Sequence, residues 1–190
     1  EKSIAETLVR DTRFPLISFT GSVPVGRAVA STVAQRLGRT LLELSGNNAI
    51  IVDKTADLSL AIRATVFGAV GTAGQRCTTT RRLFVHASRY DEVVAQLVSA
   101  YKQIRIGNPL ESGVLMGPLI DRTAVEAYRK ALEEAKQAGG KVLYGGQILD
   151  QPGFFVEPAI VKAENHWPVV QRETFAPILY VMPFEALEDA

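Results

Sequence analysis

Short apolar runs rich in β-branched residues alternate along this chain with segments whose apolar residues recur every three or four positions. The runs predict strands and the recurring segments predict helices. The predicted strands are 14–20, 40–44, 49–52, 82–86, 141–144, 157–161 and 178–182, and the predicted helices are 2–10, 22–37, 57–69, 88–104 and 121–138. This order predicts an α/β fold with a largely parallel sheet and with sites at the carboxyl ends of strands.

Helix starts and stops are also visible in the sequence. Ser22, Asp57, Ser88 and Asp121 stand where an N-cap is expected. In the helix after Ser22, Val25, Val29, Val33 and Leu37 recur at helical spacing, and Gly38 is the predicted stop.

Composition narrows the class of protein. The 190 residues are 47% hydrophobic and carry 21 basic against 20 acidic side chains, a balance that argues against a nucleic-acid partner or a polybasic membrane surface. The sequence shows neither an apolar run of the roughly 20 residues that cross a bilayer nor the pattern of a signal peptide. We therefore expect a cytoplasmic domain and, from both ends of the sequence, a piece of a longer chain.

Gly21 and Ser22 form the turn between a predicted strand and a predicted helix. Such a turn directs free backbone N–H groups at an anion, so a nucleotide phosphate is one interpretation. The spacing of Gly21 and Gly26 fits a P-loop, but Arg27 and Ala28 replace its Lys and Ser or Thr. No Gly-x-Gly-x-x-Gly fingerprint is present in a suitable context. Plain α/β scaffolding therefore remains an alternative for this turn.

The single cysteine, Cys77, is the strongest candidate for chemistry. One cysteine cannot form an internal disulfide, and a free thiol is either a buried small apolar group or a nucleophile. The small residues Gly71, Ala73 and Gly74 and the polar residues that flank Cys77 favour the nucleophile.

A thiol nucleophile needs a base, and Glu43 is a candidate. It lies between Leu42 and Leu44, where burial would raise its pKa, although strand alternation would instead turn it to solvent. The two histidines, His86 and His166, have no evident relation to Cys77, so a Cys-His hydrolase is a weak interpretation. No spacing of metal-ligand type is present, so no metal is predicted.

Four motifs together resemble one known family. They are Phe19-Thr-Gly-Ser22, Leu42-Glu-Leu-Ser-Gly-Asn-Asn48, Gly74-Gln-Arg-Cys77 and Glu173-Thr-Phe-Ala-Pro177. In this order they resemble the aldehyde dehydrogenase superfamily, over essentially the whole chain. The residues in and around these motifs are most similar to those of the α-aminoadipic semialdehyde dehydrogenase, or antiquitin-like, branch.

The resemblance implies a fold and a domain division. It implies a three-layer αβα catalytic domain with a twisted, largely parallel sheet. Residues 1–46 would be the end of the NAD-binding domain, and residues 47–190 would be a catalytic domain truncated at its C-terminal end. The family's N-terminal half, with its oxyanion asparagine, would be missing, and the isolated chain would then be weakly active or inactive.

The resemblance also implies roles for individual residues. Cys77 matches the thiolate that attacks the aldehyde, and Glu43 matches the base that activates water to hydrolyse the thioester. Gly21 and Ser22 match the turn that approaches the cofactor pyrophosphate. The cofactor would be NAD, with NADP as the alternative. Ser45 departs from the family, which has glycine at this position.

Three further positions complete the implied site. Glu173 matches the carboxylate that binds the nicotinamide ribose, and Phe175 matches the ring beside the nicotinamide. Arg76 could grip a carboxylate on a semialdehyde substrate or serve only as a cation beside the thiol. The implied parent is a homo-oligomer, a dimer or tetramer, that acts on a small-molecule aldehyde. A non-catalytic folding or interaction module and a cofactor-independent thiol acyl hydrolase are the alternatives.

Overall fold

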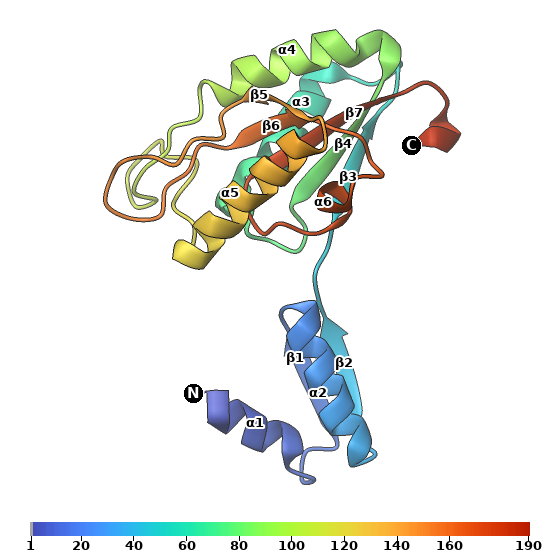
Figure 1. The fold of residues 1–190 in the computed structure, drawn as a ribbon, viewed down its shortest axis with the longest axis vertical. Helices are drawn as coiled ribbons and strands as arrows, with labels where there is room; N and C mark the ends of the chain where they lie inside the picture. The colour runs from blue at the N-terminus through green and yellow to red at the C-terminus, as the bar shows by residue number, and fades with distance from the viewer. Residues whose placement is uncertain (1) are drawn as a thin grey trace. The chain divides into compact units, whose positions relative to one another are not determined.

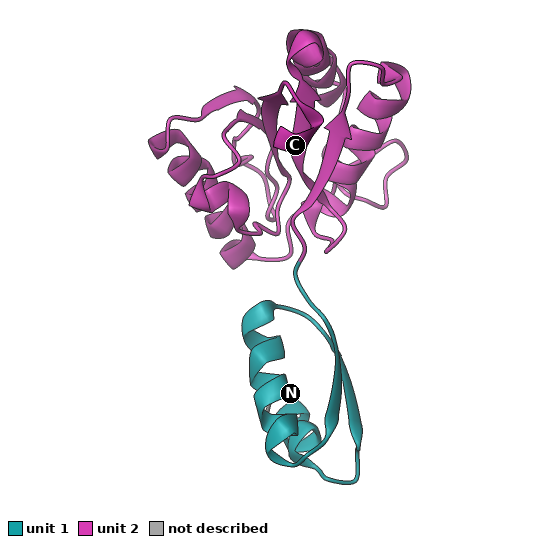
Figure 2. Ribbon diagram, turned by 90° about the vertical axis from the view of Figure 1, so that its right-hand side faces the viewer, with its two compact units in different colours: residues 1–45 teal, residues 46–190 magenta. Residues whose placement is uncertain are grey.

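The chain divides into two compact units, residues 1–45 and residues 46–190 (Figure 2). The structure is a computed structural model that describes the backbone of residues 2–190 and the side chains of residues 4–190. The predicted boundary after residue 46 lies one residue from this division. The assignment of one unit to cofactor binding and the other to catalysis stays a prediction.

The first unit is a strand–helix–strand motif preceded by a helix. Its elements are α1 (Lys2–Arg10), β1 (Leu16–Thr20), α2 (Val23–Gln35) and β2 (Arg39–Glu43), drawn in blue in Figure 1. β1 and β2 pair in parallel, with Phe19 opposite Leu42 and Thr20 opposite Glu43. A parallel pair needs a crossover connection, and α2 provides it.

Alternation in both strands of this unit separates a half-buried face from an exposed one. Phe19 and Leu42 are half-buried, whereas Leu16, Leu41 and Glu43 are exposed. Because successive side chains of a strand point to opposite faces, Glu43 shares the exposed face with Leu41.

The end of α2 differs from the predicted pattern. Leu37 is 95% exposed and has a left-handed φ of +58°, so the helical spacing that extends to it ends before it in the structure. The N–H of Gly38 donates to the carbonyl of Val33 at 3.0 Å, and that of Leu37 donates to Ala34 at 3.0 Å. These two bonds are a Schellman ending, in which the left-handed residue lies one position before the predicted stop at Gly38.

The second unit contains a five-stranded sheet with the order β3-β4-β7-β6-β5, in which β5 alone is antiparallel (Figure 1). The strands are β3 (Asn48–Val52), β4 (Thr80–His86), β5 (Lys141–Tyr144), β6 (Ala159–Lys162) and β7 (Ile178–Phe184). The helices are α3 (Leu58–Val70), α4 (Tyr90–Tyr101), α5 (Arg122–Gln137) and α6 (Pro168–Gln171), with 3₁₀ turns η1 (Gly71–Gly74), η2 (Ala87–Arg89) and η3 (Leu187–Asp189).

The core of this unit lies on both faces of its central strands. Leu83 of β4 and Val181 of β7 are fully buried on one face, and Phe84 of β4 and Tyr180 of β7 are buried on the other. Helices α3 and α4 cover one face of the sheet and α5 covers the other, as Figures 1 and 2 show. Continuous burial is typical of parallel strands covered on both faces. The predicted α/β fold with a largely parallel sheet is confirmed.

Two of the predicted N-caps form as expected in this unit. Asp57 accepts a hydrogen bond from the N–H of Leu60 at 3.2 Å, and Asp121 accepts one from Ala124 at 2.8 Å. Ser88 does not begin its helix, because it lies in η2 and α4 starts at Tyr90. Among the described residues, no helix is both long and apolar enough to cross a membrane.

Candidate active site

Cys77 lies in a backbone turn with unusual dihedral angles. After α3 ends at Val70, the chain passes through three left-handed residues, Thr72, Ala73 and Gly74, with φ of +55°, +52° and +70°. Left-handed residues other than glycine cost about 1–3 kcal/mol each and persist where surrounding contacts hold them. Cys77 follows this turn and is exposed, as a nucleophile requires. We call residues 71–79 the thiol turn.

Close packing and side-chain hydrogen bonds hold the thiol turn on one side. A Cβ added to Gly74 would lie 2.5 Å from the carbonyl carbon and oxygen of Ala176. The Gln75 side chain donates to the carbonyl of Pro118 at 3.3 Å and accepts from the N–H of Ile120 at 2.9 Å. Position 74 therefore requires glycine for two reasons, its left-handed φ and the close approach of the Ala176 backbone.

The segment that enters β3 holds the turn on another side. The Asn48 side-chain amide donates to the carbonyls of Cys77 at 2.5 Å and Thr79 at 3.3 Å. Gly46 lies so close to the Cys77 carbonyl that an added Cβ would collide with it. Asn47 donates to the Val170 carbonyl at 2.9 Å, which ties this segment to α6.

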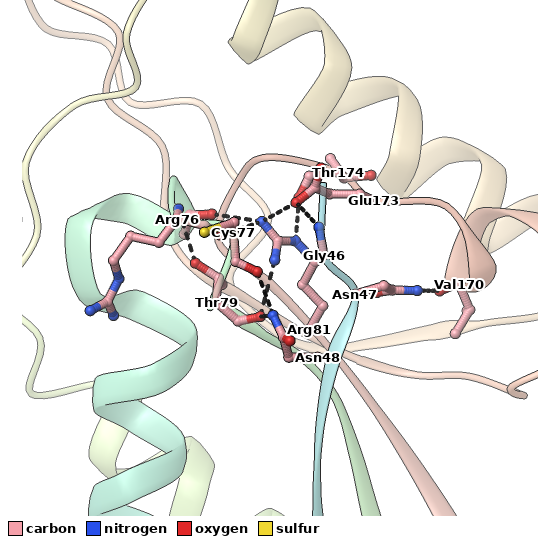
Figure 3. Close-up of polar contacts among 11 residues, drawn as sticks. Gly46, Asn47, Asn48, Arg76, Cys77, Thr79, Arg81, Val170, Glu173 and Thr174 are labelled. Carbon is pink, nitrogen blue, oxygen red and sulfur yellow. Dashed lines mark hydrogen bonds and ion pairs between the residues drawn. The ribbon is translucent and has the colours of Figure 1, made fainter. Parts of the chain in front are cut away.

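Glu173 lies next to the thiol turn, although the two are far apart in the sequence (Figure 3). Its Oε1 accepts a hydrogen bond from the N–H of Gly46 at 3.2 Å and forms an ion pair with Arg81 Nη2 at 3.1 Å. Phe175 is 46% exposed, with the Arg81 guanidinium 5.5 Å from its ring centroid. The structure thus brings Cys77, Glu173 and Phe175 into one cluster.

This cluster lies at the amino ends of the parallel strands. Gly46 and Asn47 precede β3, the thiol turn precedes β4, and Glu173 precedes β7. This cluster therefore does not follow the expectation that sites lie at carboxyl ends, and its role as a site stays a prediction. In the first unit, Gly21 and Glu43 lie at the carboxyl ends of β1 and β2, and the N–H of Gly21 donates to the Glu43 carbonyl at 3.0 Å.

The Arg76 side chain turns back along α3. Its Nη2 donates to the carbonyl of Phe67 at 3.0 Å, and its guanidinium lies 5.1 Å from the Phe67 ring centroid. Figure 3 shows the guanidinium pointing away from Cys77. Its Nε is buried without a hydrogen-bond partner among residues 2–190. In this conformation Arg76 binds the end of α3.

Glu43 is exposed in the described chain, so the interpretation as a buried carboxylate was wrong and strand alternation explains its position. Ser22 is the N-cap of α2, yet its side chain makes no capping hydrogen bond within the described part of the unit. A pocket of about 430 Å³ lies between α1 and α2 of the same unit. Its lining residues are Ala5, Glu6, Val9, Arg10, Phe19, Pro24, Val25, Ala28, Val29 and Thr32.

The histidines have structural or surface positions, as the sequence indicates. The His86 ring contacts the Phe184 ring edge-on and makes a 2.8 Å hydrogen bond with the Ser88 hydroxyl. The side chain of His166 is 75% exposed. Within the described residues, no group of three or more His, Cys, Asp or Glu side chains could hold a metal ion.

Sequence reasoning missed Arg81 and Asn48. Arg81 is buried near the start of β4, where Thr80 before it is also buried and Arg82 after it is half-buried. A charge in an otherwise buried strand requires partners, so the pair Arg81-Arg82 at the entry to an apolar run was the available signal. Asn48 gave no comparable signal, because the partners of its amide are backbone carbonyls far along the chain.

Comparison with known proteins shows the family of this chain. The sequence model of the Aldehyde dehydrogenase family matches residues 1–190. The chain belongs to the aldehyde dehydrogenase family. It is 54% identical over 190 residues to a putative aldehyde dehydrogenase family 7 member A1 homolog of Dictyostelium discoideum, covering 100% of this chain and 37% of that protein. It is 55% identical over 187 residues to the alpha-aminoadipic semialdehyde dehydrogenase of Mus musculus, covering 98% of this chain and 35% of that protein.

Solved structures of the family show the same fold. A structure described as giving insights into cofactor and substrate selection by Gox0499 matches with a TM-score of 0.93 and 34% identity, over 98% of this chain and 41% of that chain. Betaine aldehyde dehydrogenase from Staphylococcus aureus, in complex with NAD+, matches with a TM-score of 0.94 and 28% identity, over 97% of this chain and 38% of that chain. This aldehyde dehydrogenase chain therefore spans little more than a third of the relatives that it matches.

Proposed function

We propose that the parent enzyme of this chain oxidises a semialdehyde that carries a carboxylate to the corresponding acid, with NAD or NADP as cofactor. By parent enzyme we mean a protein of the relatives' length that contains these residues. The proposal rests on one observation, that Glu173 lies next to the thiol turn. The N–H of Gly46 and the Arg81 side chain hold the Glu173 carboxylate there. A cytoplasmic location and a homo-oligomeric assembly stay predictions.

The first unit offers suitable groups for the dinucleotide. The pocket between α1 and α2 is lined mainly by apolar residues, which suits a flat aromatic base. Ser22 has a hydroxyl that makes no capping bond within the described unit, and the first turn of α2 presents backbone N–H groups that favour a pyrophosphate. When bound, the nicotinamide supplies a hydride acceptor. Glu173 and Phe175 would hold its ribose and ring.

Cys77 and Glu43 are the two side chains that would take part in the reaction. The Cys77 thiolate attacks the aldehyde carbon to form a thiohemiacetal, and loss of a hydride and a proton leaves a thioester on Cys77. Glu43 accepts a proton from water, which attacks the thioester carbon and releases the acid and the thiolate. The role of Glu43 rests on the family resemblance and on its exposed carboxylate at the end of β2.

Two separate variants, Glu43→Gln and Cys77→Ala, test these two roles. In the parent enzyme, Glu43→Gln should form one equivalent of NADH per thiol in a burst and then turn over roughly a hundredfold or more slowly, because thioester hydrolysis loses its base. Cys77→Ala should form no NADH at all. Stopped-flow NADH absorbance measures both. An undiminished steady rate in Glu43→Gln, or any turnover in Cys77→Ala, contradicts the assignment.

Arg76 is the candidate for recognition of the substrate carboxylate. In that case Arg76→Gln should lower kcat/KM for α-aminoadipic semialdehyde about tenfold or more, yet leave that for hexanal, an uncharged aldehyde of the same carbon number, nearly unchanged. Equal losses for the two aldehydes would show that Arg76 acts only as a cation or a support for α3. Steady-state kinetics of both aldehydes with the wild type and with Arg76→Gln makes the comparison.

A further inference from the structure

Arg81 is a buried cation that contacts both parts of the candidate site. Its side chain is 2% exposed and extends from the second residue of β4. It donates to the carbonyls of Arg76 at 2.9 Å, Thr79 at 3.0 Å, Gly74 at 3.3 Å and Thr174 at 3.1 Å, and it pairs with Glu173 Oε1 at 3.1 Å. Figure 3 shows the guanidinium between the two segments.

Fold stability alone gives little reason for a charge at this position. Burial lowers the pKa of the Arg81 guanidinium, and the nearby Glu173 carboxylate opposes that shift. Buried ion pairs are often no more stable than apolar side chains of equal volume, because both charges lose their hydration. What an apolar side chain could not supply is a planar fork that bonds several acceptors at fixed angles.

The bonded acceptors belong to two segments whose geometry matters for the proposed reaction. The carbonyls of Gly74, Arg76 and Thr79 lie in the thiol turn, on both sides of Cys77 and next to its left-handed residues. On the other side, both described contacts of the Glu173 carboxylate fall on Oε1, from Arg81 and from the N–H of Gly46. This arrangement leaves Oε2 to accept a hydrogen bond from a ligand hydroxyl.

We propose that Arg81 is a positioning residue that fixes the Cys77 turn and the Glu173 carboxylate in one arrangement, so that nucleophile and cofactor ribose are oriented by a single side chain. The proposal deepens the proposed function and rests on it for the role of Glu173. It assigns Arg81 no direct contact with substrate or cofactor.

The kinetic test compares Arg81→Met and Arg81→Lys in the parent enzyme. Arg81→Met should raise KM for NAD about tenfold and also lower kcat, because both segments lose their common support. Arg81→Lys keeps the charge but not the fork, so it should restore less than half of the loss in kcat/KM. The matched control is Tyr128→Phe in α5, which removes the hydrogen bond from the Tyr128 hydroxyl to the Glu157 carbonyl and should lower Tm without changing KM.

A double-mutant cycle with Glu173→Gln separates positioning from general damage. If Arg81 acts through Glu173, Arg81→Met should change KM for NAD by less than about threefold in the Glu173→Gln background. The same tenfold change in both backgrounds would overturn the proposal. So would a KM for Arg81→Met equal to that of the wild type.

A second readout does not depend on activity. Amide hydrogen exchange of Arg81→Met, measured by mass spectrometry, should become about tenfold faster in peptides covering 71–79 and 173–176, and stay unchanged in those covering 122–137. Acceleration in only one segment, or everywhere, overturns the positioning role. If the wild-type parent enzyme forms no NADH or NADPH from any aldehyde, the proposed function fails, whereas this measurement still decides the role of Arg81.

Discussion

At the scale of the residue, Gly74 shows how tightly the backbone around Cys77 is packed. Alanine there would combine a left-handed φ of +70° with a Cβ 2.5 Å from the Ala176 backbone. We expect Gly74→Ala to lower the free energy of unfolding by about 2–4 kcal/mol, because backbone atoms on both sides must move. Urea denaturation of the 190-residue chain measures this change.

Gly107→Ala is the matched control for Gly74→Ala. A Cβ added to Gly107 would contact only Val114 Cγ2, at an ordinary 3.6 Å, among the described residues. This variant should change the free energy of unfolding by less than about 1 kcal/mol. Similar losses in the two variants would show that general glycine-to-alanine effects, and not the thiol turn, determine the result.

The sequence indicates Cys77 as a candidate nucleophile but does not indicate the residues that hold its backbone in place. Cys77 is identifiable because a lone thiol among small and polar residues has few other uses. The close approach of Glu173 follows only from the parallel pairing of β4 with β7, and no local pattern encodes that pairing. Arg81 illustrates the same limit, since four of its five acceptors are backbone atoms and carry no residue-type signal.

At the scale of the element, the N-termini of α2 and α5 have serine and aspartate caps with different roles. Asp121 bonds the first turn of α5, whereas the Ser22 hydroxyl makes no such bond in the described part of the chain. Asp121→Ala should therefore cost about 1 kcal/mol of stability, and Ser22→Ala less than about 0.5 kcal/mol. If Ser22 binds the pyrophosphate, Ser22→Ala should instead weaken NAD binding several-fold in the parent enzyme.

Thermal unfolding measures the stability of Asp121→Ala and Ser22→Ala, and titration calorimetry measures how tightly each variant binds NAD. Asp121→Ala should leave the Kd for NAD unchanged, because α5 lies in the second unit and contributes no residue to the proposed cofactor pocket. A loss of stability in Ser22→Ala as large as that in Asp121→Ala would indicate a structural role for the serine.

Most elements could be predicted because hydrophobic period and capping residues agree along the chain. The errors occur where backbone conformation overrides these signals. Leu37 fits the helical period, but α2 ends before it and leaves it exposed. The site in the second unit lies at the amino ends of the strands because its bonds are made by the segments that enter β3, β4 and β7, and the general rule for α/β sheets concerns carboxyl ends.

At the scale of the whole molecule, the two units differ in how many of their side chains are buried. In the described part of residues 1–45, full burial is reached at Gly26, Val29 and Val33, whereas the central strands of the second unit are buried almost throughout. Small cores stabilise weakly, so the 190-residue chain has one weakly and one strongly stabilised unit. A probe confined to the second unit is therefore needed to follow its unfolding.

Tyrosine is such a probe, because all five tyrosines lie in residues 46–190. Burial, with a smaller contribution from Asp91, raises the pKa of Tyr90 to about 12. Burial likewise raises the pKa of Tyr101, Tyr128, Tyr144 and Tyr180.

Because the tyrosine pKa values are raised in the folded state, the stability of the second unit should fall at alkaline pH. A tyrosine whose pKa is higher in the folded state contributes stability below its ordinary pKa of about 10, and this contribution is lost as the pH rises from there through the folded-state value. The second unit should therefore show little tyrosinate absorbance at about pH 10–11 and then ionise cooperatively as its circular dichroism is lost. The chain in guanidinium should titrate near pH 10. Reversible ionisation near pH 10 with the circular dichroism intact would show that these hydroxyls reach solvent in the native state.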